Sequence, residues 1–180
     1  MIPAMDSLPF HPILAHFPVV LAVLFPLVIG GLLTGILRGY LGQRAWILAV
    51  LHAGLLFAGA GAAMKTGEMD NDKVERIVPE HLIHDHQEAG EILLALAGLS
   101  LVASGGALVR SGRDGLRHGM MWASMALSLG CATASVFAGF SGISLVYVYG
   151  AAEAHRPQAV PADSSLFETP SDDGDERDVE

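Results

Sequence analysis

The run ILAHFPVVLAVLFPLVIGGLLTGIL occupies residues 13–37, and its only ionisable side chain is that of His16. This run exceeds the roughly 20 apolar residues that an α-helix needs to cross about 30 Å of hydrocarbon. Further apolar stretches follow at residues 45–63, 86–109 and 120–148. We therefore predict an all-α integral membrane protein, whose residues 1–150 form a bundle of four transmembrane helices.

The composition of the 180-residue chain agrees with this class, because 52% of its residues are hydrophobic and only 16% are charged. Four such helices in a soluble protein would leave too few residues for a polar exterior. The net charge of −9 excludes nucleic-acid binding, which needs clustered cations to neutralise phosphates. A single cysteine, Cys131, excludes an internal disulfide and an iron–sulfur cluster held by thiolates.

The charges are divided between the two ends of the predicted bundle. The connections at residues 38–44 and 110–118 carry one acid, Asp114, and five arginines: Arg38, Arg44, Arg110, Arg113 and Arg117. All other acids fall on the opposite side. Because short arginine-rich loops stay in the cytoplasm, both termini and the loop at 64–78 are expected to face outward. This places the protein in the bacterial cytoplasmic (inner) membrane, with a periplasmic or extracellular outer face.

The last thirty residues differ in character from the rest of the chain. Residues 151–180 hold nine acids against two arginines, with three prolines. Such a segment lacks the apolar surface needed to offset its ordering entropy, so we predict a disordered acidic tail. Two roles stay open for it: a solubilising segment, or a docking segment for a basic partner.

Histidines in or near a membrane span are costly, so each calls for a partner, a cavity or a ligand. At 1.5 Å per residue, His16 lies roughly 6 Å inside the outer boundary of its span and His52 roughly 18 Å below the outer end of the second. They are therefore not expected to share a site. For His52, a proton relay and a hydrogen bond to a carbonyl on another span are both open, and we favour the bond. The histidines at the outer level are His11, His16, His81, His84 and His86.

Helical geometry separates the histidines of the third span. At 100° per residue, one polar stripe contains His81, His84, Asp85, Glu88 and Glu91. His86 lies on the other side, with Leu82, Gly90 and Leu93, so we expect it to turn inward. Gly90, one turn further, would leave room for a flat ligand. On the first span, His16 shares its face with Val20 and Val23 and is expected to oppose His86.

Two neutral imidazoles at one depth in a helical bundle suit a b-type haem, with His16 and His86 as axial ligands of the iron. His11 and His84 are further candidate ligands, and His84 is the main rival to His86. Two alternatives stay open. One is a copper or zinc site, and the other is no cofactor, with each histidine satisfied by hydrogen bonds. Residues available to the copper or zinc site are His81, His84, Glu88, Met64 and Met69.

These observations favour two functions, and neither is enzymatic. The first is a small electron-transfer or cofactor-holding membrane protein that works with a separate redox partner. The second is a cofactor-free accessory or scaffolding subunit of a larger membrane complex. No arrangement of Ser, Cys or carboxylates supports a hydrolase, and no Gly-rich loop supports nucleotide binding.

The run HPILAHFPVVL at 11–21 resembles the opening of a bacterial membrane-protein family known as domain of unknown function 2231. Similar blocks are MKTGE at 64–68, HQEAGEILLALAG at 86–98 and GISLVYVYG at 142–150. The resemblance covers about residues 8–150. It implies a four-helix bacterial membrane protein, which in some relatives is fused to or accompanied by redox modules such as Rieske domains. It marks His11, His16 and His86 as family-type positions and implies no established activity.

Overall fold

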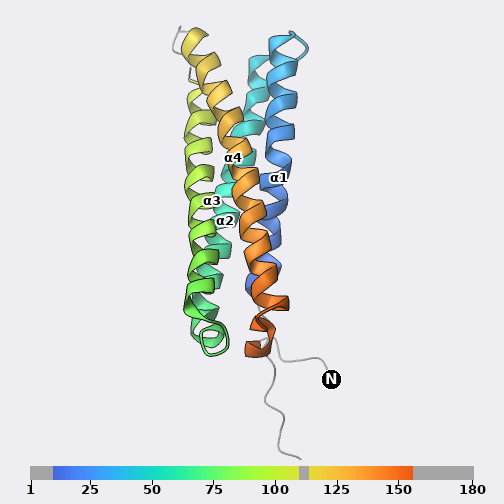
Figure 1. The fold of residues 1–180 in the computed structure, drawn as a ribbon. Helices are drawn as coiled ribbons and strands as arrows, with labels where there is room; N and C mark the ends of the chain where they lie inside the picture. Colours follow the sequence, from blue (N-terminus) through green and yellow to red (C-terminus); the bar gives the residue numbers. More distant parts are fainter. Residues whose placement is uncertain (1–9, 110–113, 156–180) are drawn as a thin grey trace, which may run out of the picture.

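The computed structural model describes residues 10–109 and 114–155. Its helices α1 (Phe10–Leu37), α2 (Ile47–Val74), α3 (Glu80–Gly106) and α4 (Asp114–Tyr147) run antiparallel in one bundle (Figure 1). In this arrangement α1 packs on α2 and α4, and α3 packs on α2 and α4. The described residues contain no strand, and all four helices are long and apolar enough to cross a membrane. The prediction of an all-α, four-helix membrane fold is confirmed.

Three helices extend well beyond their predicted spans, α2 at its end and α3 and α4 at their starts, with α4 beginning at Asp114 rather than at residue 120. α2 continues past residue 63 to Val74, through most of the stretch expected to be a loop. Exposed pairs between Lys65 and Glu68 (2.8 Å) and between Asp70 and Lys73 (3.4 Å) link successive turns of this polar extension. α3 begins at Glu80, directly after Pro79, which is its N-cap residue.

Many small side chains share the interior of the bundle with a few large ones such as Phe25, Ile29 and Leu56, and large apolar side chains cover its surface. The small buried residues include Ala22, Ala49, Ala53, Ala97, Ser100, Ser104, Ser124, Ser128 and Ser135. Leu27 and Val102 are each 72% exposed, and Phe140 is 69% exposed. This distribution suits lipid, where large apolar groups are solvated and helices associate through close backbone approach. The chain is therefore a multi-pass membrane protein whose surface faces a lipid bilayer.

Hydrogen bonds join the helices in the half of the bundle nearer the α1–α2 connection. The buried Trp46, in the short 3-10 helix η2 (Gln43–Trp46), donates its indole N–H to the Ser104 carbonyl at 3.1 Å. Ser104 in turn donates to Ser124 at 3.2 Å. These bonds satisfy polar groups that would be costly to leave unpaired in lipid.

Exposed aromatic side chains lie near both ends of α4. Trp122 lies near its start and Tyr147 at its end, and both are exposed. The rise between them is about 37 Å at 1.5 Å per residue, close to the roughly 40–45 Å of a bilayer with its interfaces. Exposed Trp and Tyr residues at such a spacing are typical of the two membrane–water boundaries of a spanning helix.

The chain after α4 does not leave the bundle at once. A 3-10 helix, η3 (Ala151–His155), follows, and Ala151 is buried against Val78, Ile83 and Leu145. The expectation that the tail begins at residue 151 is therefore wrong for 151–155, because Ala151 completes a small apolar cluster. Residues 156–180, and with them the predicted disorder, lie outside the described residues, as do Arg110 and Arg113.

Candidate functional site

Two histidines from different helices meet at one end of the bundle. His11 lies in the first turn of α1 and His86 in the second turn of α3, and both are partly buried. Their ring centroids are 6.0 Å apart and their planes are inclined at 83°, an edge-to-face arrangement. We call this the His11–His86 pair, and the end of the bundle where α1 begins and α4 ends is the His11 end (Figure 1).

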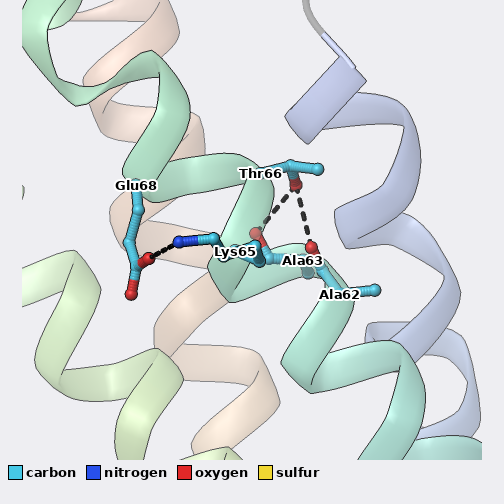
Figure 2. A network of polar contacts seen from close by, with 5 residues as sticks. All are labelled: Ala62, Ala63, Lys65, Thr66 and Glu68. Carbon is cyan, nitrogen blue, oxygen red and sulfur yellow. Dashed lines mark hydrogen bonds and ion pairs between the residues drawn. The ribbon is translucent and has the colours of Figure 1, made fainter.

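A backbone carbonyl on α2 fixes the ring of His11. Its Nδ1 lies 2.8 Å from the carbonyl oxygen of Ala63, and a carbonyl only accepts, so Nδ1 carries the proton and donates. Figure 2 shows the same carbonyl beside Thr66, whose hydroxyl lies 2.9 Å from the Ala63 oxygen and 3.1 Å from that of Ala62. The Thr66 hydroxyl is also 3.4 Å from His11 Nδ1. The helix turn at 62–66 thus holds the imidazole of α1.

A serine on α4 fixes the ring of His86. Its Nδ1 lies 2.9 Å from the hydroxyl oxygen of Ser141. That hydroxyl donates to the Ala138 carbonyl at 3.0 Å, so its oxygen is left to accept a hydrogen bond from His86 Nδ1. His86 is therefore protonated at Nδ1, like His11.

Two glycines give the rings their space. A Cβ at Gly67 of α2 would lie 3.1 Å from Cε1 of His11, and a Cβ at Gly142 of α4 would lie 3.1 Å from Cε1 of His86. Both distances are shorter than ordinary van der Waals contact. Each imidazole therefore packs directly against a glycine, and a larger residue there would occupy part of the space that the ring fills.

Because Nδ1 of each ring carries the proton, Nε2 of each ring carries the lone pair, and the Ala138 carbonyl is a further hydrogen-bond partner of the His86 ring. Histidines that bind metals have this arrangement, since a bond from the other ring nitrogen to a carbonyl or hydroxyl fixes the tautomer and the ring orientation. The pair can therefore supply two nitrogen ligands. The rings come from α1 and α3 and the groups that hold them from α2 and α4, so all four helices contribute to the site.

Among the described residues, no further His, Cys, Asp or Glu joins the pair as a third ligand. Within 10–109 and 114–155, the only group of three or more potential metal ligands within 4.8 Å of one another is His84, Asp85 and Glu88, and all three are exposed. The His11–His86 pair thus offers two imidazoles and no carboxylate or thiolate. The exposed group contains two of the residues proposed for a copper or zinc site, but not His81.

The expected pairing of His16 with His86 is wrong. His16 is exposed, and its Nδ1 bonds to the Pro12 carbonyl one turn earlier on its own helix. Its face is that of Val20 and Val23, which are also exposed. The buried face of α1 carries Pro18, Ala22, Phe25 and Ile29 at spacings of three and four, and His11 continues that face.

The other candidate positions agree with the helical geometry. The polar stripe that contains His81 and His84 is exposed, and His86 lies on the opposite, partly buried side of α3. A Cβ at Gly90 would meet no atom within 4 Å, so space lies beside this glycine. His52 donates from Nε2 to the Leu21 carbonyl at 2.9 Å, and its ring stacks on Phe25. The prediction that His52 bonds a carbonyl on another span is confirmed.

The residues that support the pair were not singled out from the sequence as parts of a site. Thr66, Gly67, Ser141 and Gly142 look like ordinary small residues of a membrane bundle. The sequence could have indicated two of them, Gly67 and Gly142, because they lie in the family-like blocks MKTGE and GISLVYVYG. The four blocks of the family resemblance therefore meet here, contributing His11, Gly67, His86 and Gly142.

Comparison with known protein families, with curated proteins and with solved structures finds no match to this chain. The resemblance to domain of unknown function 2231 accordingly stays a prediction, and the His11–His86 pair is the basis on which a function can be proposed.

Proposed function

We propose that the protein holds a b-type haem between His11 and His86 and transfers single electrons at the membrane surface. The observation that carries the proposal is the pair itself: two partly buried imidazoles from different helices, each fixed through Nδ1 and each with its lone pair on Nε2. This revises the expected ligand set, because His11 replaces His16.

The number of ligands favours haem over zinc or copper. Zinc takes three or four protein ligands at structural and catalytic sites, and copper sites add Met or Cys to imidazole. A haem iron needs only axial ligands from the protein, because the macrocycle supplies its other four nitrogens. Two histidines that no third imidazole, thiolate or carboxylate of the described residues joins match that requirement.

The separation of the ring centroids matches that of two imidazoles bound to one metal, a geometry that requires both Nε2 atoms to turn toward the metal from the edge-to-face arrangement. Metal–nitrogen bonds of about 2 Å on each side, with each nitrogen about 1 Å from its ring centre, place two imidazole centroids about 6 Å apart. The observed separation is 6.0 Å. The space beside Gly90, one turn deeper on the face of His86, suits part of a flat macrocycle.

The haem would supply one-electron exchange between ferric and ferrous iron. The chain's own groups set the conditions for it. The Ala63 carbonyl and the Ser141 hydroxyl keep both protons on Nδ1, so that both Nε2 atoms present lone pairs. Hydrogen bonds of this kind also make the ligand nitrogens more basic, which favours the oxidised metal.

We further propose that the His11 end faces the periplasm or the outside of the cell. The arginines of the two opposite connections support this orientation by the positive-inside rule. The pair then lies within two turns of the outer boundary, in reach of a separate redox protein. A bacterial inner membrane is the location that this orientation implies.

The test is a reduced-minus-oxidised absorption spectrum of the full chain purified in mild detergent, with metal analysis of the same sample. We expect the spectrum of a low-spin, six-coordinate b-type haem and a stoichiometric amount of iron. A preparation that contains neither haem nor metal, even after expression with added haem precursor, would contradict the proposal and leave the scaffolding function.

A further inference from the structure

A groove runs along the lipid-facing side of the bundle between α3 and α4, with a volume of about 710 Å³. Its floor and walls are mainly apolar and include Ile92, Leu96 and Phe137. Asp85 and Glu88 line it toward the His11 end, where Ser141 also borders it. The groove is separate from the His11–His86 pair, but Ser141 belongs to both.

The length of the groove matches one leaflet of a bilayer. From Asp85 to Leu96 the rise along α3 is about 16 Å at 1.5 Å per residue. Half of the roughly 30 Å hydrocarbon core is about 15 Å. With the two carboxylates at the membrane boundary, the apolar channel below them would be as deep as one leaflet. A ligand of this shape has a polar head and an apolar tail.

The polar side chains that line the groove accept hydrogen bonds and offer no free donor, and the His84 imidazole, with a nitrogen within 4.8 Å of both carboxylates, lies outside this lining. Among the described residues no cation lies within ion-pair distance of Asp85 or Glu88. The Ser141 hydroxyl already donates to the Ala138 carbonyl, and that of Thr133 donates to the Leu129 carbonyl. A fitting head group therefore donates hydrogen bonds. A phosphate is disfavoured because it would bring negative charge beside two carboxylates.

The ring of Phe137 lines the groove. It favours a ligand with a flat aromatic head, since aromatic rings pack well on one another. From the acceptors, the apolar channel and this ring, we propose that the groove binds a lipid-soluble quinol. Its two hydroxyls donate to Asp85 and Glu88, and its tail lies along Ile92 and Leu96. A quinone, which only accepts hydrogen bonds, binds less tightly than the quinol.

This site goes beyond the proposed function and does not depend on a bound haem, because every group invoked belongs to the groove. Its occupant would touch Ser141, which accepts the hydrogen bond from His86. Haem content and quinol binding can therefore be measured on one preparation as separate quantities.

The test measures equilibrium binding of a decyl-substituted benzoquinol and of its quinone to the full chain in detergent, under anaerobic conditions. We expect the quinol to bind about tenfold more tightly, from charge-assisted hydrogen bonds to the carboxylates. The double variant Asp85→Asn with Glu88→Gln should lose this preference, because amides also donate. Glu91→Gln is the matched control, since Glu91 is an exposed carboxylate of α3 that does not line the groove.

A second variant keeps the test decisive if the double variant does not fold. Ala89→Trp places a large side chain in the groove and should weaken binding of quinol and quinone alike by about tenfold or more, without altering haem content. Equal affinity for quinol and quinone, full binding by Ala89→Trp, or equally tight binding of phosphatidylethanolamine would overturn the proposal. Loss of haem with retained quinol binding would contradict only the proposed function.

Discussion

The rings of His11 and His86 lie edge to face, with their centroids 6.0 Å apart. His11 of α1 donates a hydrogen bond from Nδ1 to α2, and His86 of α3 donates one from Nδ1 to α4. The pair therefore links all four helices at the His11 end. An arrangement needed only for packing would be met by apolar side chains, which cost no desolvation in lipid. The polar pair therefore favours a role beyond packing.

The contact between Gly142 and His86 predicts a penalty for a single methyl group. Gly142→Ala brings a Cβ to 3.1 Å from Cε1 of His86, so the ring must move. Gly139→Ala is the control, because its Cβ meets no atom within 4 Å, and it should stabilise α4 by about 0.5–1 kcal/mol. Unfolding in detergent should show Gly142→Ala to be less stable than Gly139→Ala by about 1–3 kcal/mol. Equal stability of the two variants would argue against a tightly held ring.

The bond from His52 to the Leu21 carbonyl predicts a role in stability alone. His52→Phe keeps a ring to stack on Phe25 and removes the hydrogen bond, which should lower the free energy of unfolding by about 0.6–1.5 kcal/mol. His52→Ala also removes the stacked ring and should cost about 2–4 kcal/mol. Haem content should not change in either variant. Lost haem in a folded His52→Phe variant would show that His52 takes part in the site.

The burial of Ala151 predicts where the chain can be cut. A chain that ends at residue 157 keeps the cluster of Ala151, Val78, Ile83 and Leu145, and its melting temperature in detergent should match that of the full chain. A chain that ends at residue 149 loses this contact and should be less stable by about 1 kcal/mol. If the chain ending at 157 were already destabilised, the acidic tail would have to contact the bundle.

The arginine distribution predicts that the His11 end faces outward. Leu41→Cys and Asp70→Cys place a thiol at opposite ends of the bundle, and the native Cys131 is buried. A membrane-impermeant maleimide added to intact spheroplasts should label the cysteine at residue 70 and not the one at 41. The reverse labelling would invert the orientation and place the His11–His86 pair on the cytoplasmic side.

The four helices could be predicted because long apolar runs with so few charges are typical of membrane spans and rare in soluble folds. The extension of α2 to Val74 could not be predicted in this way, because its residues are polar and the helix there is supported by local ion pairs such as that of Lys65 with Glu68. Hydropathy detects only the part of a helix that lies in hydrocarbon.

Of the two histidines in the candidate site, the inward direction of His86 could be predicted from the sequence, and the choice of His11 over His16 could not. The reason lies in the different sequence patterns of α3 and α1. On α3 the polar stripe at His84 and Glu88 marks the exposed side, so the inward direction of His86 follows. α1 is apolar on every side and gives no such mark. Whether His11 or His16 faces the interior is decided by packing of Pro18, Ala22 and Phe25 against the other helices, which helical periodicity within α1 does not reveal.

The central claim is that His11, and not its neighbour His16 on the same helix, binds the haem with His86. The most direct measurement compares the reduced-minus-oxidised spectra of His11→Ala, His86→Ala and His16→Ala, each purified as the full chain. We expect the low-spin haem signal to vanish in the first two and to persist in His16→Ala, whose imidazole is exposed. A signal that survives loss of His11 but not loss of His16 would contradict the account.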